Sequence, residues 1–252
     1  MMIEKIQHPD QIVELRLSRP PVNALNPELV AELDQAIVAA TQSGASALIL
    51  SGSPGLFSAG LDVPELLMLD ESGMRDFWKS FFGLLGRIAQ SDVLVVAALT
   101  GHSPAGGTVL ALFADYRVQA RGDFRLGLNE VQVGLVVPPA IHHALVRLLG
   151  PYRAERHLVA GQMIPATQAL SIGLVDEIVP ADQVVERSVS WLQTHLAMPD
   201  HALKATRQLC RSDLASLFDD PEALDLDAFV KGWFEPQTQK TLKGLVERLK
   251  RS

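Results

Sequence analysis

The sequence predicts an α/β fold with parallel strand pairing, and three observations carry that prediction. Short apolar runs of strand length alternate with amphipathic stretches of helical periodicity over most of the chain. Two of these runs end in loops rich in small residues, and a helical pattern follows each loop. From about Val184 the strand signals fade, so the C-terminal part is predicted to be helical.

Periodicity marks the first strand and the first helix. Every second residue over positions 13–17 is apolar, which predicts a half-buried strand. The stretch "RPPVNALN" then breaks this pattern. Asn26 is a suitable N-cap with Pro27 at the first helical position, and apolar residues recur at helical spacing as far as Ala40.

The remaining elements follow from the same two periodicities. Residues 47–50 and 93–99 are apolar throughout and end at turn residues, which is typical of buried strands. Next we expect a helix at 106–114, a short strand at 116–119 and an apolar patch at 131–137. Helices are predicted at 191–196, 203–210 and 224–250.

Composition favours a small-molecule partner. The chain of 252 residues has 22 Lys and Arg against 29 Asp and Glu and no basic block, which argues against nucleic acid or an anionic membrane surface. Its apolar stretches are far shorter than the ~20 residues of a membrane span, and the N-terminus has no signal-peptide hydrophobic region. With a single Cys excluding an internal disulfide, we expect a reducing, cytoplasmic setting, bacterial by default.

Neither a metal nor a nucleotide-phosphate loop is indicated. None of the seven His forms a pair at metal-ligand spacing; His142 and His143 are adjacent on a predicted helix and so point to different sides. Cys210 has no Cys or His partner nearby, and neither a P-loop nor a dinucleotide-binding glycine motif occurs.

The stretch "TGHSPAGG" after the second buried strand imitates the nucleophile elbow of serine hydrolases. Two residues oppose this interpretation. Ala105 stands where the elbow needs Gly, and Pro104 after Ser103 has no N–H with which to hold an oxyanion. A serine hydrolase is therefore a weak competitor.

The same loop supports a different chemistry. If a helix begins near Ala105 or Gly106, the free N–H groups of its first turn favour negative charge. The loop "GLFSAGLDV" at 55–63 has the same makeup, so one N–H from each loop would form a pocket for an enolate or tetrahedral oxygen. The alternative is that both loops are only tight turns.

Glu130 is a carboxylate in apolar company. In "FRLGLNEVQVGLVVPP" it precedes a run rich in Val, where an ionised carboxylate is costly. Such a Glu tends to have a raised pKa, which suits a base that takes and returns a proton near neutral pH. The alternative is an outward-facing Glu on an alternating strand.

At these residues the sequence resembles the crotonase (enoyl-CoA hydratase/isomerase) superfamily over nearly its whole length. The motifs "RPPVNALN", "GLFSAGLDV", "GHSPAGGTVLALFADYRV" and "LGLNEVQVGLVVP" carry the resemblance, followed by "RAERHLVAGQMIPATQALSIGLVDEIVP". Within the superfamily, "FSAGLD", "PAGG" and "GLNE" are most similar to the mitochondrial-type 3,2-enoyl-CoA isomerases, as are "AMPDHALKATRQLCR" and "VERLK".

The resemblance implies a crotonase-like spiral of ββα turns. Sequence periodicity alone does not predict this spiral. It divides the chain into a spiral core at 1–190 and a C-terminal helical trimerisation or lid region at 191–252. It also implies a homotrimer or dimer of trimers.

For the site, the resemblance implies that the N–H groups of Leu61 and Gly106 hold a thioester oxygen and that Asn129 and Glu130 face the reacting carbons. It also implies an acyl-CoA binding segment made of Ala59, Gly60, Leu61, Asp62 and Val63. No cofactor is expected, because CoA arrives as part of the substrate. Arg19, Lys231 and Lys243 are candidates for binding its phosphates, and residues 66–86 are expected to help shape the acyl pocket.

One departure from the hydratase pattern bears on the reaction. Hydratases of this superfamily use two glutamates, and the position matching the first is Val109. With Glu130 alone, the resemblance implies a shift of the double bond of a 3-enoyl-CoA to the 2-trans position, as in fatty acid β-oxidation. The alternatives are a hydratase, a thioester hydrolase, and a non-catalytic acyl-CoA-binding subunit.

Overall fold

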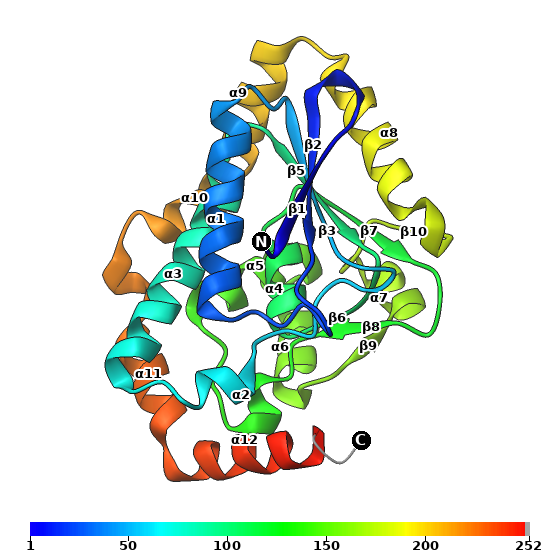
Figure 1. The fold of residues 1–252 in the computed structure, drawn as a ribbon. Helices are drawn as coiled ribbons and strands as arrows, with labels where there is room; N and C mark the ends of the chain where they lie inside the picture. The colour runs from blue at the N-terminus through cyan, green and yellow to red at the C-terminus, as the bar shows by residue number, and fades with distance from the viewer. Residues whose placement is uncertain (250–252) are drawn as a thin grey trace.

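The alternation of strands and helices is realised as a chain that moves repeatedly between two sheets (Figure 1). The computed structural model describes residues 1–249. The larger sheet within these residues is ordered β1 (Ile3–Gln7), β2 (Ile12–Leu17), β3 (Ala47–Ser51), β5 (Leu94–Leu99), β7 (Tyr116–Ala120) and β10 (Glu177–Val179). The smaller sheet is ordered β4 (Gly55–Leu56), β6 (Gly101–Pro104), β8 (Arg125–Gly127) and β9 (Ile164–Pro165).

Successive turns of this spiral contain the same elements in the same order. Each adds one strand to the larger sheet, one to the smaller sheet and then helical structure: β3, β4, then α2 (Val63–Leu66) and α3 (Glu71–Ala89). The next turns are β5, β6 and α4 (Gly106–Leu112), then β7, β8 and, after a 3₁₀ turn, α5 (Pro139–Leu149). Strands β2, β3, β5, β7 and β10 pair in parallel, as the sequence predicts; only the pairing of β1 with β2 is antiparallel in this sheet as described.

The other helices continue the spiral and close it. They are α1 (Pro27–Gln42), α6 (Pro151–Ala160), α7 (Ala166–Ile172), α8 (Val184–Leu196), α9 (Asp200–Cys210), α10 (Ser212–Ala215), α11 (Leu226–Phe234) and α12 (Pro236–Leu249). Asn26 caps α1 as predicted, its side chain accepting a hydrogen bond from the Leu29 N–H at 2.9 Å. No helix in the described part of the chain is long and apolar enough to cross a membrane.

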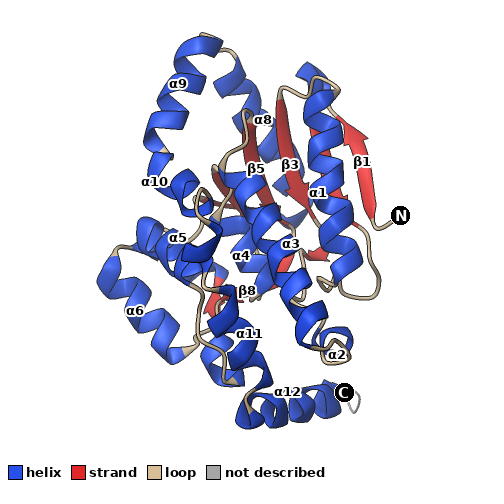
Figure 2. Cartoon of the chain, turned by 90° about the vertical axis from the view of Figure 1, so that its left-hand side faces the viewer, coloured by secondary structure: helices blue, strands red, loops and turns tan. Residues whose placement is uncertain are grey.

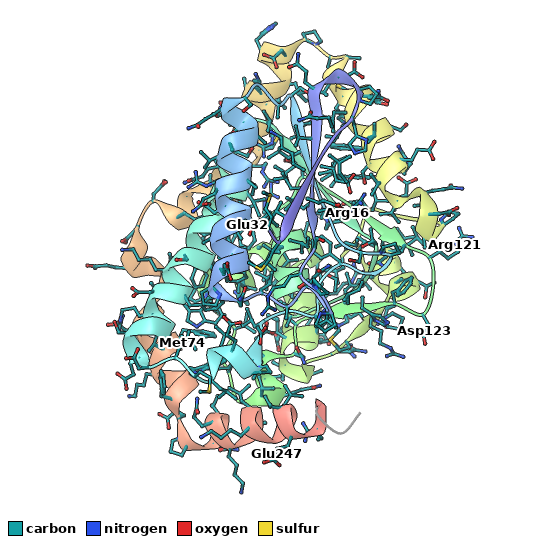
Figure 3. The ribbon with its side chains drawn as sticks, in the orientation of Figure 1. Arg16, Glu32, Met74, Arg121, Asp123 and Glu247 are labelled. Atoms are coloured by element: carbon teal, nitrogen blue, oxygen red, sulfur yellow. The ribbon has the colours of Figure 1, made fainter. Side chains whose placement is uncertain are left out.

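The larger sheet is covered on both faces. Helices α1, α3 and α4 bury one face in the main hydrophobic core, and α8 covers the other (Figures 1 and 2). Strands β3 and β5 are therefore buried along their whole length, as predicted from their apolar runs. Side chains fill the space between the layers, while charged residues such as Arg121, Asp123 and Glu247 lie on the outside (Figure 3).

Strand β2 differs from its prediction, because it is buried on both faces rather than half-buried. Glu14 is fully buried. Its carboxylate accepts hydrogen bonds from Ser51 Oγ at 2.6 Å and Arg16 Nε at 3.1 Å, and it lies 2.8 Å from His8 Nε2. These partners make burial of the charge tolerable.

The C-terminal prediction of one helix at 224–250 is also wrong. The segment breaks at Asp225, which has a left-handed φ of 50°, and again at Glu235, whose extended ψ of 136° is what a following proline favours. Lys250 lies outside the described residues. Helix α8 begins at Val184, earlier than the predicted 191, so the proposed boundary between 190 and 191 falls inside this helix.

Two buried arginines bind carbonyl groups at the end of α4: Arg117 from β7 of the spiral, and Arg211, which attaches the C-terminal helices to the spiral. Arg211, just beyond α9, donates to the Phe113 carbonyl at 2.6 Å, and Arg117 donates to the Ala114 carbonyl at 3.0 Å. Asp115 pairs with Arg211 at 3.1 Å. These cations stand at the C-terminal end of α4, where they complement the helix dipole.

Candidate active site

The first candidate N–H donor, Leu61, lies in the loop that follows β4. Its neighbours are fixed on both sides: the Leu25 N–H donates to the Gly60 carbonyl at 2.7 Å, and the Asp62 N–H donates to the Leu25 carbonyl at 3.0 Å. Ser58 Oγ accepts from the Gly60 N–H at 3.1 Å. The Leu61 N–H itself makes no hydrogen bond within the described residues, so it is available to a ligand.

A polar clamp holds this loop from the outside. Arg19 contacts Asp62 Oδ2 at 2.7 Å and Glu65 Oε2 at 3.0 Å, and it donates to the Ala24 carbonyl at 3.0 Å. Asn26 donates to the same Glu65 carboxylate at 2.9 Å. These contacts hold Arg19 against the Leu61 loop, and its role in phosphate binding stays a prediction. Sequence reasoning missed this clamp because its members are separated along the chain.

The second candidate donor, Gly106, is the first residue of α4. The preceding residue, Ala105, has φ 46° and ψ −117°, a conformation that a side chain makes costly. The Ala105 N–H is held by the Gly127 carbonyl at 2.8 Å, while the Gly106 N–H makes no hydrogen bond within residues 1–249. The predicted helix start at Gly106 is confirmed, and the turn is shaped by its neighbours rather than by glycine alone.

The two loops approach so closely that side chains would separate them. A Cβ added at Gly60, whose φ is +85°, would lie 2.9 Å from the Pro104 carbonyl oxygen and 3.4 Å from the Gly106 nitrogen. A Cβ added at Gly106 would lie 3.5 Å from the Leu61 nitrogen. The unused N–H groups of Leu61 and Gly106 are thus neighbours, as an oxyanion hole requires.

Glu130 reaches the same region through strand pairing. Strand β8 pairs with β6 so that Gly127 lies opposite Pro104, and Glu130 follows Gly127 by three residues. Glu130 begins a 3₁₀ turn (Glu130–Val133), so the alternative of an outward-facing Glu on a strand is wrong. Asn129, half-buried, immediately precedes this turn.

One oxygen of the Glu130 carboxyl group is buried without a compensating partner, although the residue as a whole is half-buried. Its Oε2 is buried and has no hydrogen-bond partner among the described residues. Burial raises the pKa of Glu130 from its ordinary 4.5 to about 7, against a smaller opposing effect of its own backbone N–H. The predicted rise in pKa is therefore present. A carboxyl group of this kind can accept and return a proton near neutral pH.

The features that favoured other chemistries do not assemble a site. Ser103 is fully buried with an unpartnered Oγ, which leaves it unsuited as a hydrolase nucleophile. His143 contacts Asp213 at 3.1 Å. Across residues 1–249 no group of three or more His, Cys, Asp or Glu side chains is placed to hold a metal ion. Lys231 and Lys243 lie exposed on α11 and α12, and their role in phosphate binding stays a prediction.

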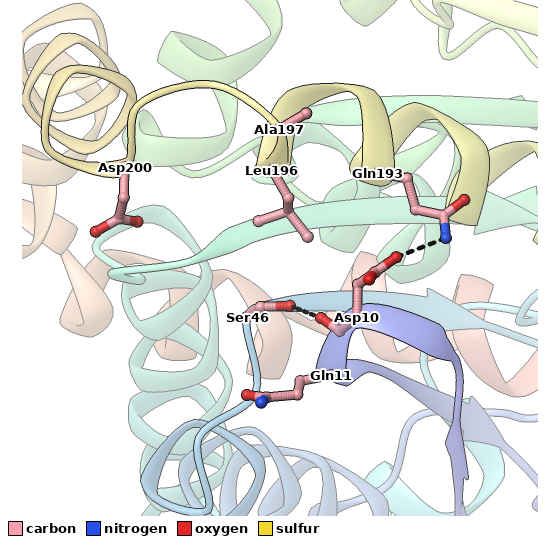
Figure 4. Close-up of a pocket in the computed structure, with 7 residues that line it drawn as sticks. All are labelled: Asp10, Gln11, Ser46, Gln193, Leu196, Ala197 and Asp200. Carbon is pink, nitrogen blue, oxygen red and sulfur yellow. Dashed lines mark hydrogen bonds between the residues drawn. The ribbon is translucent and has the colours of Figure 1, made fainter.

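A hollow of about 590 Å³ lies elsewhere on the surface (Figure 4). Asp10 and Ser46, two residues lining it, precede β2 and β3, so it sits at the N-terminal edge of the parallel strands. Leu61 and Gly106 follow the other ends of β3 and β5. Ligands of open parallel sheets bind at the carboxyl ends of the strands, which favours the Leu61 and Gly106 region.

Comparison with known proteins agrees with this geometry. Residues 7–252 match the family model described as enoyl-CoA hydratase/isomerase. The chain is 34% identical over 242 residues to human mitochondrial enoyl-CoA delta isomerase 1, covering 95% of this chain and 80% of the human protein. It is also 34% identical over 197 residues to the probable enoyl-CoA hydratase EchA17 of Mycobacterium tuberculosis H37Rv, covering 77% and 74% of the two chains.

Solved structures give the same picture. The crystal structure of human mitochondrial delta3-delta2-enoyl-CoA isomerase superposes with a TM-score of 0.93 at 33% identity, covering 100% of this chain and 99% of that one. The enoyl-CoA hydratase EchA3 of Mycobacterium ulcerans has a TM-score of 0.80 at 27% identity, covering 92% and 97%. The spiral is therefore the crotonase fold.

The clamp on the Leu61 loop predicts the effect of replacing Arg19. Arg19→Met should lower the free energy of unfolding by about 1 kcal/mol, because the ion pairs of Arg19 with Asp62 and Glu65 are partly solvated. The same variant should lower kcat more than it raises KM, because the Leu61 N–H is displaced. Chemical denaturation and steady-state kinetics measure both. Arg87→Met, which removes an ion pair with Asp34 between α3 and α1, is the matched control. Equal effects of the two variants on kcat would contradict a role of Arg19 in positioning the Leu61 N–H.

Burial of Glu130 also predicts a pH dependence of stability. Because folding raises its pKa from 4.5 to about 7, the folded protein binds more protons between these values. This group's contribution is therefore fully present below pH 4.5 and lost as pH rises through about 7, by up to about 3 kcal/mol.

Urea denaturation at pH 5 and pH 8 measures this contribution. The loss of stability on going to pH 8 should be smaller in Glu130→Gln than in the wild type, whereas Glu155→Gln, on the exposed side of α6, should behave as the wild type. Identical pH dependence in all three proteins would show that Glu130 is not desolvated as described.

Proposed function

Because the chain belongs to the enoyl-CoA hydratase/isomerase family, we propose that it is a Δ3-Δ2-enoyl-CoA isomerase that converts 3-enoyl-CoA to 2-trans-enoyl-CoA. Two observations carry this proposal: the Glu130 Oε2 is buried and unpartnered in a carboxyl group whose pKa burial raises to about 7, and the backbone N–H groups of Leu61 and Gly106 are unused. The substrate brings its own CoA, so the reaction as proposed uses no further cofactor.

The two N–H groups would act on the thioester oxygen. Removing a proton from C2 of a 3-enoyl-CoA moves negative charge onto that oxygen, giving a dienolate. Donors already held in place by Leu25 and Gly127 stabilise this charge without reorganisation, and each contributes on the order of 3 kcal/mol. We assign these donors to Leu61 and Gly106.

Glu130 would carry the proton. Its carboxylate takes the proton from C2, becomes neutral in its desolvated site, and returns the proton to C4, so that the double bond moves and the enzyme is regenerated. A pKa of about 7 suits both steps, because neither protonation state is strongly favoured at neutral pH. Asn129 and the segment 59–63 are proposed to contact the substrate.

The surroundings of α4 favour isomerisation over hydration. Addition of water across a double bond needs one group to activate the water and another to protonate carbon, and the resemblance places the first of the two hydratase glutamates at Val109. Val109 is an apolar residue only 2% exposed. Hydratase-named relatives nevertheless occur, so hydration is the second candidate function.

A paired assay tests the proposal. Purified protein should convert 3-hexenoyl-CoA to the conjugated 2-enoyl thioester, followed by its ultraviolet absorbance, with negligible addition of water to 2-hexenoyl-CoA. Glu130→Gln should lose most turnover, by at least about 100-fold, while keeping its circular dichroism spectrum. Turnover of Glu130→Gln equal to that of the wild type would contradict the role of Glu130 as the base.

Other outcomes point to the alternatives. Hydration without conjugation would mean that a residue other than Val109 supplies a second base. Thioester affinity without proton exchange at C2 would indicate a binding subunit, and release of free CoA would indicate a thioester hydrolase.

The pKa of Glu130 predicts the pH profile of the reaction. Since the base form is the carboxylate, kcat/KM should rise tenfold per pH unit below about 7 and level off above it. Steady-state kinetics between pH 5 and pH 9 measure this profile. An acidic limb centred near pH 4.5 would show that the carboxyl group works in a solvated environment, contrary to the proposal.

A further inference from the structure

A buried hydroxyl group connects the two halves of the proposed site. Thr108 is the third residue of α4 and is only 1% exposed. Its Oγ1 donates a hydrogen bond to the Ser103 carbonyl on β6 at 2.5 Å and accepts one from the Gly127 N–H on β8 at 2.7 Å. One hydroxyl therefore joins the helix that begins at Gly106 to two strands of the smaller sheet.

This hydroxyl lies at a weak point of the smaller sheet. Strand β8 pairs in parallel with β6 through two residue pairs, and Gly127 lies opposite Pro104. In such a ladder the Gly127 N–H points toward the Ser103 carbonyl, and Thr108 Oγ1 bonds to both of these groups. Pro104 has no N–H to contribute to the ladder. The Thr108 hydroxyl thus strengthens a short and incomplete strand pairing.

Gly127 is held through both of its backbone polar groups. Its N–H is bound by Thr108, and its carbonyl accepts from the Ala105 N–H at 2.8 Å. A Cβ added at Gly127, whose φ is +144°, would lie 2.4 Å from the Gln162 carbonyl oxygen. The Gly127 peptide is therefore fixed to the first turn of α4 and packs closely against residue 162, and Glu130 follows it by three residues.

We propose that Thr108 is a positioning residue that fixes the Gly106 N–H relative to the Glu130 carboxyl group. This inference rests on the proposed function, in which the N–H holds the thioester oxygen and the carboxylate takes the proton from C2 of the same substrate. Thr108 touches no reacting atom, because both hydrogen bonds of its hydroxyl are made to backbone groups. It acts through Gly127, from which the chain passes to the 3₁₀ turn that begins at Glu130.

The proposed reaction is sensitive to this alignment. As the proton leaves C2, negative charge reaches the thioester oxygen, so the base and the donor must both be in place in the transition state. A misplacement of about 1 Å can lower a rate roughly 100-fold. Binding of the substrate before reaction depends less on this alignment, so its loss should lower kcat rather than raise KM.

Substitutions at position 108 separate the hydroxyl from the rest of the side chain. Thr108→Val replaces the hydroxyl with a methyl group of similar size, and Thr108→Ser keeps the hydroxyl and removes the methyl group. Thr108→Ala differs from Thr108→Ser only by the hydroxyl, so this second pair isolates the hydroxyl even if Thr108→Val does not fold.

Ser188→Ala is the matched control. Ser188 is fully buried in α8, and its Oγ donates to the Val184 carbonyl at 2.8 Å. This helix covers the face of the larger sheet opposite to α4, so the variant removes a buried, hydrogen-bonded hydroxyl without touching the proposed site.

The experiment measures kcat and KM for 3-hexenoyl-CoA in the wild type and these variants. Thr108→Val and Thr108→Ala should lower kcat at least about tenfold and change KM less than about threefold. Thr108→Ser should keep kcat within about threefold of the wild type, and Ser188→Ala should keep the wild-type kcat. Wild-type kcat in Thr108→Ala, an equal loss in Thr108→Ser, or an equal loss in Ser188→Ala overturns the positioning role.

Binding of acetoacetyl-CoA separates this inference from the proposed function. Transfer of its C2 proton to Glu130 gives an enolate with the same charges as the proposed intermediate, and its ultraviolet absorbance reports the bound form. If the wild type isomerises no substrate, the isomerase proposal fails, and the ratio of the Kd values of acetoacetyl-CoA and butyryl-CoA tests the alignment instead.

In that case Thr108→Ala should raise this ratio at least about tenfold relative to Thr108→Ser, because the enolate depends on aligned groups more than the saturated thioester does. The same ratio in both variants, or a wild type with no preference for acetoacetyl-CoA, overturns the positioning role of Thr108.

Discussion

The proposed site depends on one constraint: two backbone N–H groups from different turns of the spiral must point at the same atom. This requires two parallel strands, β3 and β5, to deliver their following loops side by side. It also requires a closeness of approach that side chains would prevent, as the distances at Gly60 and Gly106 show. The remaining features of the site hold these two peptides still.

Different parts of the chain supply that support. Arg19 and Asn26, from the beginning of the chain, restrain the Leu61 loop through Asp62 and Glu65. At the far end of α4, Arg117 and the C-terminal Arg211 bind the last carbonyls of the helix that begins at Gly106. The C-terminal helices are thus tied to the helix that carries a donor, and the donor geometry reflects the folding of the whole chain rather than of one loop.

Sequence reasoning succeeded where the signal is local. The buried strands β3 and β5 follow from runs with no polar residue, and the start of α4 follows from the small residues before it. The raised pKa of Glu130 agrees with the prediction made from the Val-rich run, and its cause in the structure is burial. The spiral of ββα turns came from family resemblance, because periodicity does not specify which strands pair.

What the sequence could not predict depends on residues that meet only in the folded chain. Burial of Glu14 is possible because His8, Arg16 and Ser51 converge on it, and nothing at its own position indicates this.

The break in the C-terminal helices did have a local signal in Pro236, which ends a helix at the residue before it. Helix α3 likewise carries a clear pattern, with Asp70 as its N-cap and apolar residues at helical spacing.

Placing the charge-stabilising groups on the main chain also affects how such an enzyme evolves. A main-chain N–H belongs to every residue except proline, so most mutations at Leu61 leave the donor chemistry in place and alter only what surrounds it. Under the proposed function, substitutions at side chains such as Val109 and Glu130 would change the reaction while the backbone donors for an enolate oxygen are retained.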